Sequence, residues 1–355
     1  MEEILDICGT EFEKIYEDIK KRYLSNTNFP KMIIGTGLSI SMGIPGMYSL
    51  GQKLDDEFSN LESCHLKEIW DSHKDKIKSD GLEAALLDVS TNEDIFIKRI
   101  KEITSEFILD EEYAQHSNIM SCVSGFEKLL EYLSRTVSVN NPLIDVMTPN
   151  YDRIIELTCD KLKLRTTLGF FGNTYQSFNS NILKSPYDFY AKRTPLVRVF
   201  KPHGSINWIK RDNGEYQCND YQFLKDNKQR IDIVAPGRSK YEAGMINDIF
   251  RCHREIFNEI ISDSKKDFSI FIYGYGFNDQ HFNAVFEDTE KNVIVLTKEI
   301  KYQFIEKALK HDNWTLFYQD SNDENKNYMI YRQKKYILNE KLWDLSIFSK
   351  YFFYG

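Results

Sequence analysis

The sequence predicts an α/β fold, a Rossmann-like doubly wound parallel sheet with an inserted helical module. Four segments carry this prediction, at residues 33–47, 147–156, 201–208 and 271–283. In each, a buried apolar strand runs into a loop of Gly, Asn, Asp or Ser, which is how a doubly wound sheet forms a ligand crevice at its strand ends. Apolar strands also alternate with amphipathic helices, and this alternation favours parallel pairing.

The predicted elements follow in order along the chain. An amphipathic helix with apolar residues at Phe12, Ile15, Ile19 and Tyr23 precedes a first strand at residues 32–34. Between residues 52 and 140 turn signals thin out, and apolar stripes at helical spacing predict a helical insertion. Further strands are predicted at residues 143–147, 197–202, 232–236, 268–274 and 292–297, with a helix at 245–261.

The stretch from residue 314 to 353 predicts a strand, a polar loop and an aromatic-rich tail that packs back on the body. We therefore treat residues 1–355 as a single unit with three parts. Residues 52–140 form the helical insertion, 141–300 the remainder of the Rossmann-like core, and 301–355 a C-terminal packing segment.

Composition limits the classes of function. The 355 residues are 41% hydrophobic and 14% aromatic, which is typical of a folded chain rather than a disordered one. A formal charge of -8 gives no global positive field, so direct binding of nucleic acid is not expected. No apolar run approaches the roughly 20 residues that cross a bilayer. The N-terminus is acidic where a signal peptide is basic, so we expect a cytoplasmic protein without a membrane partner.

The cysteines predict no metal site. Six of them are scattered along the chain without a C-x-x-C pair, which fits a reducing compartment. The nearest approach to a ligand pair is Cys64-His65 or Cys252-His253, and adjacent residues rarely point at one ion. We expect these thiols to be structural.

The first glycine-rich loop reads Gly35-Thr36-Gly37-Leu38-Ser39 and continues to Gly43-Ile44-Pro45. Small residues after a strand let backbone amides approach a pyrophosphate at a helix N-terminus. The third glycine comes too late for the dehydrogenase pattern G-x-G-x-x-G. For the Gly-Thr-Gly run alone, a tight turn is the alternative. The candidate nucleotide contacts in this loop are Gly35, Thr36, Gly37, Ser39 and Pro45.

The second segment contains Asn150 and Asp152 directly after a buried strand. At such a position an amide can orient a bound ligand or a water, and a carboxylate can stabilise positive charge or hold the loop. Asn150 fits the first role and Asp152 the second. For Asp152 an equally supported alternative is the N-cap of a helix that begins at Arg153.

His203 is the candidate general base. An imidazole can accept a proton from a ribose hydroxyl or a water near neutral pH and later return it. We expect Gly204 and Ser205 to keep its approach open and Trp208 to form a wall of the pocket. His253, in contrast, falls on an apolar helical stripe and is interpreted as a core residue.

The fourth segment places Gly274, Tyr275 and Gly276 after an apolar strand, as candidate cofactor contacts. Asp279 and His281 follow and are expected to cap and fix this loop. A metal bound by these two residues lacks a third ligand.

Together the four segments resemble the sirtuin family. In that family NAD is bound by four motifs, and each has a counterpart here. They are a Gly-x-Gly-x-Ser loop followed by Gly-Ile-Pro, a Thr-Gln-Asn-Ile-Asp motif, a His-Gly motif and a late Gly-Tyr-Ser-Phe loop. KPHGSINW is similar to bacterial sirtuin-like domains of defence systems. The resemblance implies that His203, Asn150 and Asp152 are catalytic, and that the bond between nicotinamide and ribose is cleaved.

Two departures from the sirtuin deacylases bear on the reaction. The zinc ribbon of two C-x-x-C pairs is missing, and Gly46, Met47 and Tyr48 replace an Asp-Phe-Arg run. The chain therefore resembles the NAD glycohydrolases, which consume NAD as a substrate and release nicotinamide and ADP-ribose. We expect an effector of bacterial anti-phage defence that depletes NAD. The alternatives are an NAD-dependent protein deacylase and a non-catalytic module that senses NAD or ADP-ribose.

Such an enzyme needs a switch, because an ungated NAD hydrolase would drain its own cell. The resemblance to defence proteins implies a homo-oligomer on which a HerA-type ATPase can dock and act as the switch. The candidate contact surfaces are the helical insertion and the aromatic tail at residues 343–354. For the tail, packing on its own domain is the alternative.

Overall fold

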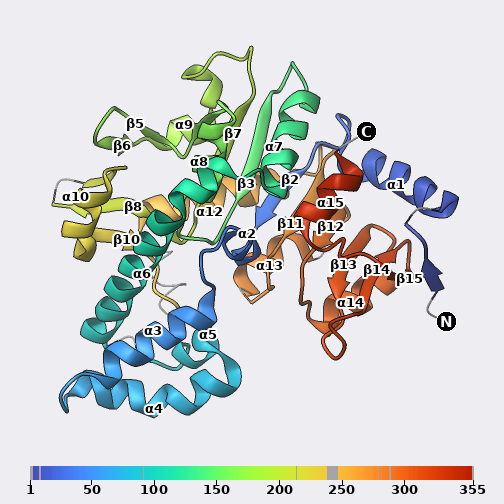
Figure 1. Ribbon diagram of the computed structural model, residues 1–355. Coiled ribbons are helices and arrows are strands. Elements are labelled where there is room, and N and C mark those ends of the chain that lie inside the picture. Colours follow the sequence, from blue (N-terminus) through green and yellow to red (C-terminus); the bar gives the residue numbers. More distant parts are fainter. Residues whose placement is uncertain are drawn as a thin grey trace.

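The computed structural model describes residues 3–7, 9–90, 92–212, 214–237, 247–278, 280–287 and 289–353. Within these ranges the main sheet has a central parallel part in the order β13, β12, β11, β2, β3, β7, β4 (Figure 1). This arrangement confirms the predicted Rossmann-like α/β fold. The strands are β2 (Lys31–Ile34), β3 (Leu143–Met147), β4 (Arg165–Thr167), β7 (Leu196–Phe200), β11 (Ser269–Tyr273), β12 (Asn292–Leu296) and β13 (Trp314–Gln319).

Three further strands extend this sheet beyond β13. β14 (Asn327–Tyr331) and β15 (Lys334–Leu338) pair antiparallel, and β1 (Glu3–Leu5) lies parallel to β15 at the edge. The turn between β14 and β15 is Arg332-Gln333, and both residues have positive φ, as a tight two-residue hairpin requires.

Helices cover both faces of the sheet, because the strands are apolar on both sides. In β2, Met32 and Ile34 point into one core and Ile33 into the other. The first face is covered by α1 (Thr10–Tyr23), α7 (Gly125–Thr136), α8 (Ile154–Lys161) and α15 (Leu345–Phe352). The second is covered by α12 (Asp248–Ile261), α13 (Gln280–Glu287) and α14 (Tyr302–Lys310).

The aromatic tail packs on its own domain. Phe348 and Phe352 are fully buried and stack with their ring centroids 3.9 Å apart. Phe352 also meets Phe12 of α1 edge to face at 6.4 Å. These two rings therefore belong to the core. The other large apolar residues of the tail up to residue 353 are half-buried against it: Trp343, Ile347, Tyr351 and Phe353.

A helical module interrupts the sheet domain between β2 and β3. It consists of α3 (Met47–Ser59), α4 (His65–Asp80), α5 (Leu82–Leu86) and the long α6 (Asp94–Ser121), and it projects away from the sheet (Figure 1). Its own core includes Phe58, which stacks on Trp70 at 4.9 Å. The next helix along the chain, α7, packs instead against α15 and α8 of the main body.

A second, antiparallel sheet was not predicted. Its order is β10 (Ile231–Ile233), β8 (Gly204–Arg211), β9 (Gly214–Gln217), β6 (Gln176–Phe178), β5 (Phe170–Phe171). The strand predicted at residues 232–236 is therefore shorter and pairs antiparallel with β8. Residues 204–208 are strand rather than open loop, and Trp208 is buried 5.0 Å from the ring of His253 instead of forming a pocket wall. Short helices α9 (Ser180–Lys184) and α10 (Tyr221–Asp226) accompany this sheet.

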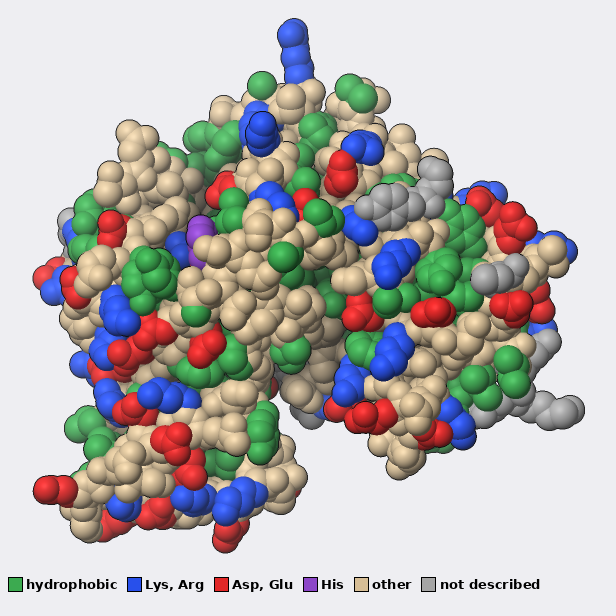
Figure 2. Space-filling model, viewed as in Figure 1, with side chains coloured by type: hydrophobic (Ala, Val, Ile, Leu, Met, Phe, Trp, Pro, Cys, Tyr) green, Lys and Arg blue, Asp and Glu red, His purple; other side chains and the backbone are tan. Residues whose placement is uncertain are grey.

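Charges are mixed over the surface. Figure 2 shows acidic and basic side chains interspersed across the visible face, without a broad patch of one sign. In the described part of the chain, no helix combines the length and the apolar character needed to span a membrane.

Candidate functional site

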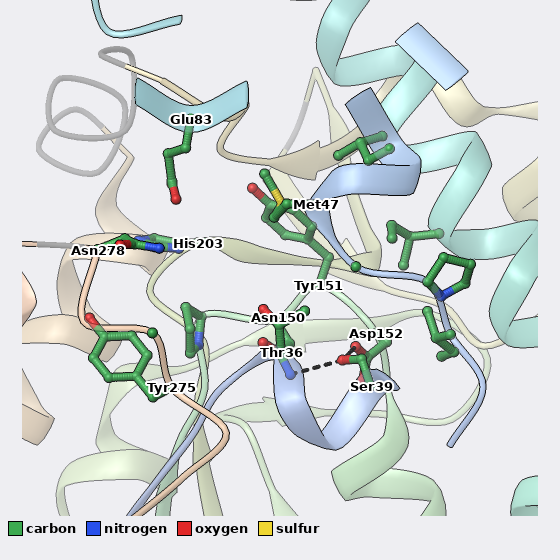
Figure 3. Close-up of a pocket in the computed structure, with 17 residues that line it drawn as sticks. Thr36, Ser39, Met47, Glu83, Asn150, Tyr151, Asp152, His203, Tyr275 and Asn278 are labelled. Carbon is green, nitrogen blue, oxygen red and sulfur yellow. Dashed lines mark hydrogen bonds between the residues drawn. The ribbon is translucent and has the colours of Figure 1, made fainter. Parts of the chain in front are cut away.

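The candidate site is a pocket at the carboxyl ends of four neighbouring strands, β11, β2, β3 and β7. The chain leaves β2 toward β3 and later adds β11 on the other side of β2, so β2 is a topological switch point, where α/β sheets bind ligands. Most candidate residues meet here (Figure 3). The lining residues are Thr36, Ser39, Ile44, Pro45, Gly46, Met47, Leu50, Glu83, Ile108, Pro149, Asn150, Tyr151, Asp152, His203, Tyr275, Gly276 and Asn278.

Three of the predicted glycines hold two loops together instead of lining the pocket. The Gly35 amide donates to Tyr273 O at 2.8 Å and the Gly37 amide to Gly274 O at 2.9 Å. A Cβ atom on Gly37 would lie 2.5 Å from the Gly274 Cα atom. Both amides are therefore engaged within the protein, and the glycines let the loop before α2 (Thr36–Ser41) pack against the loop after β11.

A hydrogen-bond network joins the loops after β2 and β3. Asn150 Nδ2 donates to Gly35 O at 2.9 Å and to Ser39 Oγ at 3.0 Å. Ser39 Oγ in turn donates to Asp152 Oδ2 at 2.6 Å. The other carboxylate oxygen, Asp152 Oδ1, accepts from the Ile154 amide at 3.2 Å at the start of α8. The helix begins at Ile154 with Arg153 as its N-cap, so Asp152 is not the N-cap that the alternative interpretation expected; it precedes the cap, accepts from the first residue of α8 and lines the pocket.

Burial raises the pKa of Asp152 to about 6. The Lys201 ammonium and the Ser39 hydroxyl oppose this shift, while the nearby Glu112 carboxylate adds to it. A carboxyl group with this pKa is mostly ionised at neutral pH, so Asp152 can stabilise positive charge that develops in the pocket.

His203 reaches the pocket from the turn after β7. Its carbonyl accepts from the Val234 amide at 2.9 Å, which fixes the turn to the end of β10. Gly204 follows with φ of +80°, and a Cβ atom there would lie 2.3 Å from Asp232 O. Because the backbone of β10 lies so close, the residue next to His203 must be glycine. The core residue His253 differs: it accepts from the Lys201 amide at 3.2 Å, and burial lowers its pKa to about 3.

Lys201 is a site residue that the motif analysis missed. It is fully buried beneath the pocket, where its ammonium donates to the Asp152 carbonyl and, at 3.0 Å, to Ser205 Oγ. It also forms an ion pair of 2.8 Å with Glu156 of α8. Lys201 therefore ties the segment that carries His203 to the segment that carries Asn150 and Asp152. The sequence signal that could have identified Lys201 is a lysine directly after the apolar strand β7.

The helical module also contributes to the pocket, which sequence reasoning did not anticipate. Met47 and Leu50 of α3 and Ile108 of α6 supply apolar walls, and Glu83 of α5 supplies a carboxylate. One turn further along α6, the buried Glu112 pairs with Arg153 at 2.6 Å, so α6 holds the loop that carries Asn150 and Asp152. Module and site loops are thus directly connected.

The residues considered as metal ligands lie partly outside the described ranges. Asp279 and the side chain of His281 lie outside the described residues, and so does Cys8. Within the described ranges, no three His, Cys, Asp or Glu side chains are grouped so that they could hold a metal ion.

Residues 145–313 match the family model of the SIR2-like domain. This match covers a little less than half of the chain and supports a SIR2-like domain in that region. The matched region includes Asn150, Asp152, His203 and Tyr275, which all line the pocket, and it leaves out the first glycine loop and the helical module. SIR2-like domains use NAD, so NAD-related activity is the general expectation for this pocket. No curated protein matches the chain.

Proposed function

We propose that the SIR2-like domain of this chain is an NAD glycohydrolase, which cleaves NAD to nicotinamide and ADP-ribose. The observation that supports this most directly is the convergence of Asn150, Asp152 and His203 on one pocket at a switch point of the sheet. The three residues come from two different loops, and Ser39 of the short helix α2 connects two of them. Such convergence of polar groups is typical of a catalytic site.

The roles follow from the chemistry of the glycosidic bond. When the bond to nicotinamide breaks, its electron pair neutralises the pyridinium ring and positive charge develops on the ribose. The Asp152 carboxylate stabilises this charge, and its pKa of about 6 leaves it ionised at neutral pH. The Asn150 amide, held by Gly35 O and Ser39, orients the ribose or the attacking water. His203 accepts a proton from a ribose hydroxyl or from water.

We also propose which residues contact the bound NAD. Thr36, Ser39, Pro45, Tyr275 and Gly276 line the pocket and can contact NAD directly. Gly35, Gly37 and Gly274 do not line the pocket. They allow the loop after β2 to pack closely against the loop after β11.

The experiment is incubation of the protein with NAD, followed by chromatography of the products. We expect equal amounts of nicotinamide and ADP-ribose. Loss of the imidazole in His203→Ala should lower the rate by roughly 100-fold or more, the contribution of a positioned general base. His311→Ala is the matched control, because His311 is an exposed residue after α14. Wild-type turnover by His203→Ala would overturn the assignment.

The same incubation, repeated with an acetylated peptide and with a measurement of NAD binding, separates the alternatives. A deacylase would form O-acetyl-ADP-ribose only with an acetylated peptide, and a sensing module would bind NAD without nicotinamide release.

We further propose that the enzyme is a defence effector whose turnover is gated by assembly, as a homo-oligomer or on a HerA-type ATPase. Since Phe348 and Phe352 of the tail are buried, we place the contact surface on the helical module, which also lines the pocket. A turnover assay across protein concentrations, with and without the neighbouring gene product, tests the gate. A dilute monomer at full rate would contradict it.

A further inference from the structure

The helical module brings a second carboxylate to the pocket. Glu83 lies in the first turn of α5, directly after Gly81, whose φ of +89° turns the chain at the end of α4. Its side chain is half-buried and lines the same pocket as His203. Figure 3 shows it extending from α5 toward the space beside His203 and Asn278.

The two carboxylates of the pocket lie on different sides. In Figure 3, Asp152 lies with Ser39 beyond Asn150, whereas Glu83 lies on the side of His203. Both oxygens of Asp152 are engaged, one by the Ser39 hydroxyl at 2.6 Å and one by the Ile154 amide at 3.2 Å. Asp152 is thus suited to stabilise charge but poorly placed to collect a proton. Cleavage at an anomeric carbon commonly uses two carboxyl groups, one that stabilises the sugar and one that activates water.

Glu83 is also held firmly relative to His203. The neighbouring Leu82 and Leu86 are buried in the core of the module. Two ion pairs fix the module to the body: Lys101 of α6 pairs with Asp232 of β10 at 2.6 Å, and Glu112 of α6 pairs with Arg153 at 2.6 Å. β10 is the strand whose following residue, Val234, binds the His203 carbonyl. Glu83 and His203 are therefore positioned by connected parts of the structure.

We propose that Glu83 is a catalytic residue on the acceptor side of the site, which with His203 directs the water that captures the ribosyl carbon. This inference rests on the proposed function. In the step, the bond between C1′ and the nicotinamide nitrogen breaks and its electron pair goes to the ring. The water oxygen bonds to C1′, and its proton passes to Glu83 or His203 and then to solvent. The products are nicotinamide, ADP-ribose and one proton.

The test is Glu83→Gln, which keeps the shape and removes the base. We expect kcat for nicotinamide release to fall at least about 10-fold, with KM for NAD and binding of ADP-ribose unchanged. With methanol as competing nucleophile, the ratio of methyl-ADP-ribose to ADP-ribose should rise, because water loses its directing group. Glu83→Asp should recover part of the rate. Asp80→Asn is the matched control, since Asp80 is an exposed carboxylate at the end of α4 and does not line the pocket.

The outcomes are distinguishable from failure of the proposed function. Wild-type protein that releases no nicotinamide overturns both proposals. If the wild-type protein is active and Glu83→Gln has the same rate and the same ratio of methyl-ADP-ribose to ADP-ribose, only the role of Glu83 is overturned. An unchanged unfolding temperature of the variant shows that a lower rate is not a folding defect.

Discussion

The Ser39 hydroxyl donates a hydrogen bond of 2.6 Å to the Asp152 carboxylate, although 113 positions separate them in the chain. The same hydroxyl accepts from Asn150 Nδ2 at 3.0 Å. Ser39 therefore sets the orientation of an amide and a carboxylate at once. Because a serine oxygen has one proton and two lone pairs, it can do both without competition.

The first prediction concerns Ser39→Ala. The variant leaves a buried carboxylate oxygen and one amide proton without this partner, which typically costs about 1–3 kcal/mol. We expect nicotinamide release to fall about 10-fold or more, since each 1.36 kcal/mol of lost transition-state stabilisation is tenfold in rate. Ser41→Ala is the control: Ser41 is in the same helix but bonds the Leu38 carbonyl, at 2.7 Å, and does not line the pocket. Equal rates for both variants would contradict the role of Ser39.

The second prediction concerns the stability of Asp152→Asn. Burial raises the Asp152 pKa from 3.8 to about 6, so the protonated form favours folding. The contribution of Asp152 to the free energy of unfolding is therefore fully present below pH 3.8 and is lost as the pH rises through 6. Asparagine does not titrate and can still accept from the Ile154 amide. The free energy of unfolding of the variant should therefore increase relative to that of the wild type between pH 4 and pH 6. Above pH 6 the difference should reach at most about 3 kcal/mol.

Denaturant unfolding at pH 4 and pH 8 measures this difference, and turnover should fall in the same variant. The charges that act on Asp152 are those of Lys201, which lowers the pKa, and Glu112, which raises it. A wild-type protein that is more stable than Asp152→Asn at pH 8 would show that the ionised carboxylate is compensated rather than strained.

The sequence predicted those site residues that directly follow buried strands. Asn150 and His203 are recognisable because a strand end in a doubly wound sheet points at the ligand crevice. Tyr275 shares this position, and Ser39 lies in the short helix α2 that follows β2. Their contact with the pocket needed no knowledge of distant partners.

Lys201, Glu83 and Glu112 could not be predicted in the same way. Lys201 and Glu112 act through residues far along the chain, such as Arg153 for Glu112, and a buried charge reveals its partner only in three dimensions. Glu83 belongs to a helix of the module, and only the fold brings it to the pocket. The small antiparallel sheet was missed for a related reason. Its strands, such as β5 (Phe170–Phe171), are very short, and β8 begins at the residue after His203, where a loop was expected.

The third prediction compares two glycine substitutions. In Gly37→Ala the new Cβ lies 2.5 Å from the backbone of Gly274, so the loops after β2 and β11 must separate. We expect a loss of stability of roughly 1–3 kcal/mol and weaker NAD binding. Gly51→Ala in α3 is the control, because its nearest neighbour is Leu82 Cβ at 3.9 Å. There alanine should be neutral or stabilising by up to about 1 kcal/mol. Thermal unfolding and NAD titration measure both, and a Gly37→Ala protein that binds NAD normally would contradict the close approach.

The last prediction concerns the ammonium of Lys201 beneath the pocket. Lys201→Met leaves the Glu156 carboxylate without its ion pair of 2.8 Å and the Asp152 carbonyl without its donor. Breaking a buried pair from one side typically costs about 3–5 kcal/mol. Lys31→Met is the control, because its partner Asp145 keeps Arg198 at 2.7 Å and lies within β3 rather than in the pocket.

Adding Glu156→Leu to Lys201→Met removes the stranded charge, so most of the stability should return. Activity should not return with it, since the Asp152 carbonyl and Ser205 still lack the donor that joins their two segments. Denaturant unfolding and nicotinamide release separate these effects. Full activity in the stable double variant would show that Lys201 serves the fold alone and does not position Asp152 against His203.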